Sequence, residues 1–578
     1  MISRTLIIFF VIFAANVFGS RFYINFPQPV ALEYIKIEGD LLKRVSMNFN
    51  RLEEEKYWPL NVYLTDKQSR GWPGDTEGRT ILGLVLDAIT TGRAPKYLDS
   101  ILLILPTKLN EKGYMGTVYQ NEMNEQQLSG NGWMLRGLCE YYIWEKDPKV
   151  LKYIQTISQN LFVAGKGYYS KYPIDPGLRK KEVGEMVGSN QGTTNGWMLS
   201  SDVGCLFIGM DGAIQAYSIT KDPKLKEVID EMIARFYQID FVKVKAQTHA
   251  TLTGLRGLIR FAEITDDFKY LEKVEKVWFL YKQYGMTENF ENYNWFCRYD
   301  TWTEPCAIVD SYMIAVKLWQ YTENLKYLED AELIQYNAIA HTQHKNGGFG
   351  LDICPNSKQP FLNVKANEAH WCCTMRGAEG LSNMANNAYF IKSDTLIIPF
   401  LSTNTLNIND DIIIKQQTEY PQKGNVSFEI QKIDSKISCV NISFHSRFMK
   451  NPVLKINGQS GQVVIKNDFI ILNRKLKAND KIELNFENVL RFENAINREN
   501  IGNHSRKVMF GPLVLGFESI KSISIDQYST LSNNKDEFSI KSGVNKFILT
   551  PVYHLMDPKV WKDSGYQKQI LFSNEISK

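Results

Sequence analysis

Five short stretches decide the fold, and each pairs a helix-ending residue with a helix-opening one: Ala94-Pro95-Lys96-Tyr97-Leu98, Asp147-Pro148-Lys149-Val150-Leu151, Asp222-Pro223-Lys224-Leu225, Asp267-Phe268-Lys269-Tyr270-Leu271 and Asn324-Leu325-Lys326-Tyr327-Leu328. Each follows one amphipathic stretch and opens another, so the polar residue and the proline act as stop and start signals. Successive copies lie 53, 75, 45 and 57 residues apart. This spacing is too irregular for an open solenoid and favours helical hairpins closed into a toroid.

The sequence around these stretches has the period of helices. Between about residue 40 and residue 345, apolar residues recur at helical spacing, as in Ile81, Leu82, Val85 and Ile89. We therefore expect residues 21–393 to form a mainly α, (α/α)6 toroid, or barrel, that carries the catalytic residues.

The pattern of residue types changes after about Ser393. Short alternating or β-branched runs follow, separated by Asn, Gly, Asp and Lys, for example at 395–400, 426–430 and 481–486. The sequence therefore predicts one or more all-β sandwich domains over residues 394–578. Such domains commonly carry no chemistry, so we expect this one to pack against the toroid and brace it.

The N-terminus has the layout of a secretory signal peptide over residues 1–20. Arg4 precedes an apolar run at 6–18, and the small residues Gly19 and Ser20 follow. The run is too short to span a bilayer, and no cysteine follows the expected cleavage point to carry a lipid. We expect a periplasmic or secreted protein with no membrane insertion.

The overall charge bears on the class of partner. A net charge of +4 over 578 residues provides no basic stripe that could neutralise a phosphate backbone. Nucleic acid is therefore not an expected partner.

The densest group of reactive side chains is Glu304-Pro305-Cys306 together with Trp371-Cys372-Cys373-Thr374. Neighbouring cysteines rarely form a disulfide because the geometry is strained. A carboxylate and a thiol two positions apart can turn to one point at a helix start, and two adjacent thiols could complete a tetrahedral zinc site. The alternative is that these cysteines are buried small apolar residues. That simpler interpretation is preferred for the others: Cys139, Cys205, Cys297, Cys354 and Cys439.

A zinc-bound cysteine would be more than a structural ligand. Such a cysteine is a thiolate at neutral pH, so the metal supplies the activated nucleophile that covalent catalysis requires. One sulfur can then serve as both ligand and nucleophile.

These residues resemble glycoside hydrolase families 127 and 146, the β-L-arabinofuranosidases. The resemblance is detailed from about residue 240 to residue 400. It rests on Glu304 to Cys306, on the stretch 321–330 followed by Tyr336-Asn337, on Trp371 to Thr374 with Gly377 and Glu379, and on Gly511-Pro512-Leu513-Val514. It implies Zn²⁺ held by Glu304, Cys306, Cys372 and Cys373, with Cys372 as the nucleophile.

The resemblance also implies an acid/base glutamate. Thr287-Glu288-Asn289-Phe290 matches the corresponding segment and places Glu288 16 residues before Glu304. Without the resemblance, Glu288 would read as a solvated loop carboxylate, and Glu291 would be an equal candidate. Four further residues fall near sugar-contacting segments of the family: His249, Glu77, its neighbour Asp75, and Tyr114. A lone histidine near a helix start is also a common cap.

The resemblance implies a retaining, exo-acting hydrolase that releases β-L-arabinofuranose or a related furanoside from plant pectic glycans. Two segments depart from it, since Gly132-Trp133-Met134 and Gly204-Cys205-Leu206 lack a histidine that family members carry before a helix. The sugar pocket is therefore expected to differ. Two alternatives remain open: a toroidal unsaturated-glucuronyl hydrolase or polysaccharide lyase, and a non-catalytic glycan-binding protein with structural zinc.

Overall fold

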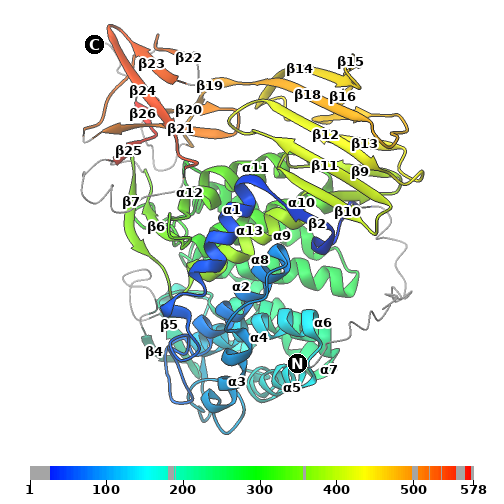
Figure 1. Ribbon diagram of the computed structural model, residues 1–578. Coiled ribbons are helices and arrows are strands. Elements are labelled where there is room, and N and C mark those ends of the chain that lie inside the picture. Colours follow the sequence, from blue (N-terminus) through cyan, green and yellow to red (C-terminus); the bar gives the residue numbers. More distant parts are fainter. Residues whose placement is uncertain are drawn as a thin grey trace.

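A helical domain is followed along the chain by a β-rich region of several sheets (Figure 1). The structure is a computed structural model that describes residues 26–179, 188, 190–355, 360–496, 505–519, 521–526, 528–534, 537–554 and 567–573. The predicted signal peptide lies outside these residues. None of the helices described is long and apolar enough to cross a bilayer.

Six helices form a closed inner ring: α2 (Asp75–Thr91), α4 (Glu125–Glu145), α6 (Leu206–Thr220), α8 (Thr248–Thr265), α10 (Pro305–Thr322) and α13 (Cys373–Asn386). Each packs on the next, and α13 packs on α2. Nearly every residue of α10 is buried, as expected of a helix surrounded by others.

Six further helices lie outside this ring: α1 (Gly39–Arg51), α3 (Leu98–Lys108), α5 (Pro148–Ile157), α7 (Pro223–Gln238), α9 (Tyr270–Tyr284) and α11 (Lys326–Ile334); the short α12 (Ala340–Thr342) follows α11. Each outer helix packs on an inner neighbour. The side chains of Asp147 and Asp222 accept hydrogen bonds from the backbone N–H of Lys149 and Lys224, and a proline follows each cap. The predicted (α/α)6 toroid is confirmed, and two of the predicted start signals are helix caps.

Glycines let three inner helices approach closely. A Cβ at Gly78 of α2 would lie 2.3 Å from the backbone nitrogen of Met134, and one at Gly212 of α6 would lie 2.3 Å from the carbonyl of Gly132. Backbone contact at this distance leaves no room for a side chain. The residues that these helices direct into the ring are therefore held at short range from one another.

The β-region is built mainly from three sheets among the residues described. A six-stranded sheet has the order β1 (Gln28–Pro29), β8 (Phe390–Lys392), β9 (Thr395–Ile398), β13 (Cys439–Ser443), β17 (Phe469–Leu472) and β16 (Ile465–Lys466). A seven-stranded sheet has the order β15 (Gln459–Ser460), β14 (Met449–Ile456), β18 (Lys481–Asn488), β12 (Asn425–Lys432), β11 (Ile412–Thr418), β10 (Asn404–Ile408) and β2 (Ile35–Ile37). Ile482, Leu484 and Phe486 alternate with exposed residues along β18, the pattern of a sheet with one face on a core.

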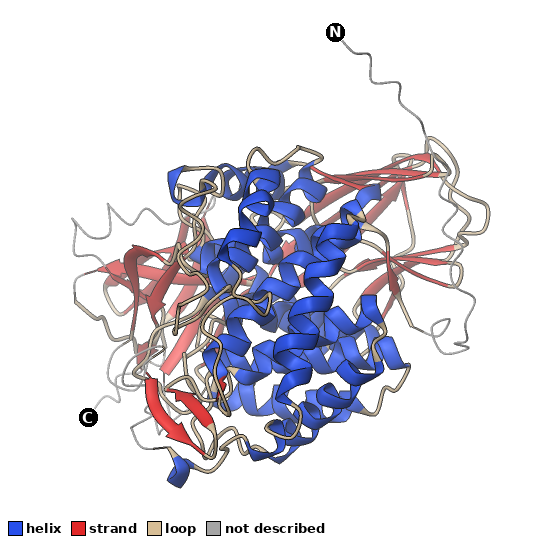
Figure 2. Ribbon diagram, turned by 90° about the horizontal axis from the view of Figure 1, so that it is seen from below, coloured by secondary structure: helices blue, strands red, loops and turns tan. Residues whose placement is uncertain are grey.

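The third sheet runs β22 (Thr530–Asn534), β23 (Glu537–Ser542), β24 (Asn545–Pro551), β21 (Leu513–Ser519), β25 (Gln567–Gln569), β7 (Phe361–Glu368) and β6 (Gly350–Ile353). Beside it lie β19 (Leu490–Asn494), β20 (Ser505–Phe510) and β26 (Phe572–Ser573). A small separate sheet joins β3 (Met123–Asn124), β5 (Trp197–Ser200) and β4 (Asn190–Thr194). Figure 2 shows the helices gathered in the middle with strands on either side.

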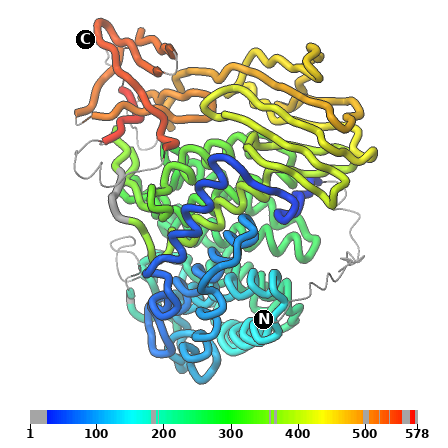
Figure 3. Tube along the Cα trace, viewed as in Figure 1, coloured from blue at the N-terminus to red at the C-terminus, as the bar shows by residue number. Residues whose placement is uncertain are grey.

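Strands from distant parts of the chain complete these sheets. Gln28 of β1 pairs with Ile391, Ile37 of β2 pairs with Asn404, and Phe361 of β7 pairs with Gln569. In Figure 3 the blue start of the chain accordingly lies against yellow-green strands. The predicted division at residues 393/394 stays a prediction, but the sheets beyond it take strands from both ends of the helical domain.

Candidate active site

Two neighbouring inner helices bring the predicted ligands together. Glu304 precedes the first residue of α10, and Cys306 lies in its first turn. Cys372 precedes α13, which begins at Cys373. Because α10 packs on α13, the starts of both helices meet inside the ring. The expectation that Glu304 and Cys306 lie at a helix start is thus confirmed.

The three sulfur atoms form one compact cluster. The Sγ atoms of Cys306 and Cys373 are 3.6 Å apart, and those of Cys372 and Cys373 are 3.3 Å apart. All three lie within 4.8 Å of one another, and Cys306 belongs to a second group of this size with Glu304 and His249. The four predicted ligands therefore lie in two overlapping groups that share Cys306.

This donor set fits zinc. Two thiolates at about 2.3 Å from a tetrahedral ion lie about 3.8 Å apart, close to the sulfur separations observed. Three sulfurs and a carboxylate are also ligands that zinc accepts. The carboxylate of Glu304 faces His249, whose Nδ1 lies 3.1 Å away, and Gln247, whose Nε2 donates over 3.2 Å.

The cluster favours one thiolate. Burial raises the pKa of Cys306, but hydrogen bonds with Cys372 and Cys373 and the positive charge of Arg79 outweigh burial and hold that pKa well below its ordinary value. The hydrogen bond with Cys306 raises the pKa of Cys372, and burial raises the pKa of Cys373. Arg79 and the two neighbouring thiols therefore favour the thiolate form of Cys306.

Arg79 of α2 is a site residue that the sequence alone did not identify. Its Nη1 donates to Sγ of Cys306 over 3.1 Å, while its Nε and Nη2 each lie 2.9 Å from an oxygen of Asp75. Asp75 and Glu77 were noted in the segment Gly74 to Gly78, directly before this arginine. An arginine one helical turn after Asp75 was the available signal.

A ring of guanidinium groups surrounds Trp133. The guanidinium carbons of Arg79, Arg376 and Arg256 lie 4.1, 4.6 and 5.6 Å from its ring centroid. The His249 ring stacks on the same indole at 5.9 Å. The tryptophan is buried inside α4, within the stretch that the apolar spacing predicts to be helical.

Buried carboxylates balance these cations. Arg256 contacts Asp310 at 3.0 Å and Glu379 at 2.9 Å, and Arg376 contacts the same two residues. Glu379 had been noted only as part of the family resemblance. Charged groups buried this deeply are tolerated because each is paired with an opposite charge. The ion pairs therefore hold these side chains in place.

His249 lies beside the cluster, and its predicted contact with the sugar stays a prediction. It is the second residue of α8, and its Nε2 lies 3.8 Å from the carboxylate of Asp310. Gln247, not His249, provides the side chain that caps α8. The histidine therefore connects Glu304 to the buried charge network.

Glu288 has a different environment. It lies in the loop between α9 and α10, and Lys507 of β20 contacts both its carboxylate, at 3.3 Å, and its backbone carbonyl, at 3.0 Å. Both side chains are buried. Asn292 of the same loop accepts the backbone N–H of Glu304 over 3.1 Å, which ties the loop to the metal-ligand segment.

Glu77 and Tyr114 are not placed at the cysteine cluster by the contacts described. Glu77 accepts hydrogen bonds from the backbone N–H and the hydroxyl of Thr65, at 2.8 and 2.7 Å. Tyr114 is buried in the apolar core of the toroid. The contacts described for both residues are therefore with neighbouring parts of the toroid.

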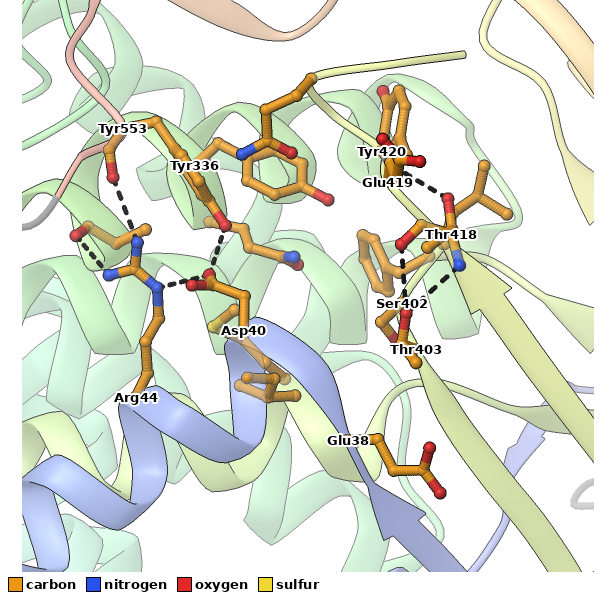
Figure 4. A pocket seen from close by; sticks show the side chains of 17 residues that line it. Glu38, Asp40, Arg44, Tyr336, Ser402, Thr403, Thr418, Glu419, Tyr420 and Tyr553 are labelled. Carbon is orange, nitrogen blue, oxygen red and sulfur yellow. Dashed lines mark hydrogen bonds and ion pairs between the residues drawn. The ribbon is translucent and has the colours of Figure 1, made fainter. Parts of the chain in front are cut away.

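A cavity of about 110 Å³ lies elsewhere, between α1 and the β-region (Figure 4). Asp40 and Arg44 project into it from α1 opposite Tyr553, whose backbone carbonyl accepts from Arg44 over 3.2 Å. The cysteines do not line it. The cavity marks the contact between toroid and β-region and is not the site described above.

Comparison with protein families matches two consecutive domains. The model described as β-L-arabinofuranosidase, GH127 catalytic domain, matches residues 214–386, and that described as β-L-arabinofuranosidase, GH127 middle domain, matches residues 396–488. The matched catalytic segment contains α8, α10, α13 and the cysteine cluster, so the chain is a glycoside hydrolase. The chain is therefore a glycoside hydrolase family 127-like protein over these residues, as the sequence resemblance predicted.

Solved structures agree with this assignment at the level of the fold. A GH127 β-arabinofuranosidase is 14% identical, with a TM-score of 0.68 over 96% of this chain and 99% of that one. A second glycoside hydrolase gives 13% and 0.68 over 95% and 98%, and a GH127 β-L-arabinofuranosidase from Geobacillus stearothermophilus T6 gives 12% and 0.63 over 94% and 100%. A comparison with curated proteins gave no match.

Proposed function

We propose that this glycoside hydrolase is a retaining, exo-acting enzyme that releases β-L-arabinofuranose or a related furanoside from plant pectic glycan side chains, with Cys372 as nucleophile and Glu288 as acid/base. The observation that carries the proposal is the cluster of three sulfurs at the starts of α10 and α13, with Glu304 beside it. We further propose that the protein is exported, on the layout of residues 1–20.

Zinc is the cofactor that this donor set fits, with Glu304, Cys306, Cys372 and Cys373 as its ligands. Bound there, the ion would keep the cysteine sulfurs deprotonated at neutral pH. That contribution matters for Cys372, since its hydrogen bond with Cys306 raises its pKa.

Cys372 is the member of the cluster best placed to react. Cys306 and Cys373 are fully buried, whereas Cys372 is partly exposed and its neighbour Trp371 is 45% exposed. A nucleophile needs a path to the sugar, and of the three cysteines only Cys372 has exposed surface. In the proposed first step, Sγ of Cys372 bonds to the anomeric carbon as the glycosidic C–O bond breaks, and Glu288 gives its proton to the leaving oxygen.

In the second step, water replaces sulfur at the anomeric carbon. Glu288, now a carboxylate, takes one proton from that water, and Cys372 leaves as a thiolate. Two inversions at one carbon give net retention. The link between the Glu288 loop and Glu304 through Asn292 supports placing both residues in one site.

Trp133 supports a changed sugar pocket. It lies in a segment where the family resemblance implies a histidine, and its indole is enclosed by three arginines. A bulky ring leaves less room and offers one donor in place of the two nitrogens of histidine. The proposal therefore includes furanosides other than L-arabinofuranose.

The test combines metal analysis with hydrolysis of a panel of aryl furanosides. The wild type, Cys372→Ser, Glu288→Gln and the exposed control Glu272→Gln are compared. We expect zinc in the wild type, loss of activity by at least about 100-fold in the first two variants, and wild-type activity in the control. Zinc-free protein, or full activity in both site variants, would favour the lyase and glycan-binding alternatives over this proposal.

A further inference from the structure

A second group of potential metal ligands lies outside the cysteine cluster. Glu291 follows α9, His341 is in α12, and Asp352 is in β6. One donor atom from each lies within 4.8 Å of the other two, and all three residues are fully or almost fully buried. The His341 Nε2 and Asp352 Oδ2 atoms are 2.9 Å apart.

The hydrogen bonds around this group leave its inner atoms unused. Cys354 donates to Oε2 of Glu291 over 3.0 Å, and the backbone of Asp352 exchanges two hydrogen bonds with Thr303. Yet Glu291 Oε1 and Asp352 Oδ1 are buried without a hydrogen bond among the described residues, and Nε2 of His341 and Oδ2 of Asp352 have each other as polar neighbours at 2.9 Å. Such atoms are costly to bury unless something binds them.

The orientation of His341 shows which atom would bind. Its Nδ1 lies 2.7 Å from the carbonyl oxygen of Val552, an acceptor only, so Nδ1 carries a proton. In the neutral ring Nε2 is then a lone pair aimed at the carboxylate of Asp352. A backbone carbonyl that fixes the far nitrogen of a histidine is the usual second contact of a metal-binding imidazole.

The charges lead to the same conclusion. Two carboxylates beside one imidazolium would leave a net negative charge in the interior, whereas two carboxylates, a neutral imidazole and a divalent cation sum to zero.

We propose that Glu291, His341 and Asp352 bind a divalent metal ion, of the zinc or manganese type, at a site separate from the cysteine cluster. Zinc and manganese ions bind a histidine nitrogen together with carboxylate oxygens, whereas calcium binds oxygen ligands. The site shares no ligand with the cluster, so it stands whether or not the thiols bind zinc.

This ion would fix the loop that carries the proposed acid/base. Glu291 is three residues after Glu288, and Asp352 is paired with Thr303, the residue before Glu304. Val552, from the segment after β24, adds a contact from the β-region. The metal would therefore act as a positioning element that joins this loop, the toroid and the β-region.

The first test counts metal ions in the full chain after exposure to buffered Zn²⁺ and removal of free ion, by plasma mass spectrometry. We expect two equivalents in the wild type and in the control His554→Gln, which alters an exposed histidine. His341→Gln and Asp352→Asn are expected to hold one. Cys306→Ser combined with Cys373→Ser is expected to lose the other.

The combination of variants separates the two sites. Loss of one equivalent in His341→Gln, with any result in the cysteine variant, supports the new site. An unchanged zinc content in both His341→Gln and Asp352→Asn overturns it, as does a single equivalent that only the cysteine variant loses.

A second measurement uses the wild type alone, so it does not depend on the variants folding. Co²⁺ is titrated into metal-free protein while the absorption spectrum is recorded. We expect two phases, one with sulfur-to-cobalt charge-transfer bands and one with visible d–d bands only. Saturation in one sulfur-type phase would overturn the proposal.

Discussion

Arg79 on α2 and Cys306 on α10 meet across the ring, with Nη1 of the arginine 3.1 Å from the sulfur. Asp75 holds the other side of the same guanidinium through two contacts of 2.9 Å. The cation is thereby fixed where it stabilises a thiolate, and neither residue can shift without breaking the pairing of the other.

Removal of that cation is expected to raise the pKa of Cys306. Arg79→Gln takes away a positive charge that favours the thiolate, so a rise of about 1–3 units is expected. The measurement is the pH dependence of alkylation of the Cys306 peptide in chelator-treated protein, by mass spectrometry. Arg474→Gln, at an exposed arginine, is the control; an unmoved midpoint for Arg79→Gln would contradict the assignment.

Cys372 is expected to carry the sugar during turnover. A furanoside with a good leaving group and slow second step should leave a mass increment on the peptide containing Cys372, because the attacking sulfur forms the covalent bond. Cys372→Ser should lose it. An increment on the Cys373 sulfur instead would reassign the nucleophile, and an inverted product by proton NMR would exclude the two-step route.

Breaking the buried pair of Glu288 and Lys507 is expected to lower the unfolding free energy of the protein. Lys507→Met leaves the buried Glu288 side chain without its partner and should cost about 3–5 kcal/mol of unfolding free energy. Lys507→Met with Glu288→Gln should recover much of it. Lys546→Met, which breaks an exposed pair with Glu537, should cost under about 1 kcal/mol. Equal losses in the single and double variants would show that the charge is not the cause.

Glu77 is expected to make stability fall between about pH 4.5 and 7. Burial raises its pKa from 4.5 to about 7, so the folded protein retains a proton that the unfolded chain releases. Stability from this group is full below pH 4.5 and is lost as pH rises through 7, by about 3 kcal/mol. Glu77→Gln keeps an acceptor for Thr65 and should flatten the denaturation–pH curve, whereas Glu145→Gln, at an exposed position, should not.

The parts of this fold that local sequence specifies were predictable. Asp147 and Asp222 cap helices where the Asp-Pro-Lys pattern predicts them, and Cys306 lies in a first helical turn as its spacing from Glu304 indicates. The parts of the fold that depend on ring closure could not be predicted from the sequence. Arg79 is 227 residues from Cys306, and only the contact of inner helices joins them.

The same reason explains what the sequence could not place. Glu77 was selected for its position near a family segment; one of its carboxylate oxygens accepts from Thr65, and its role stays a prediction. Trp133 lies in a stretch predicted to be helical, but only ring closure brings the arginines of other helices onto its indole. His341 and Asp352 belong to no short motif, and only the folded chain brings them within 2.9 Å of each other.

The pairing of β2 with β10 has a consequence during synthesis of the chain. Ile37 leaves the ribosome more than 360 residues before its partner Asn404, so the edge of the seven-stranded sheet cannot form until the entire helical domain has been translated. Long-range pairing of this kind is slow and leaves strands exposed meanwhile. An N-terminal fusion that ends close to Gln28 should therefore lower the yield of folded protein more than a fusion of equal size at a loop of the helical domain.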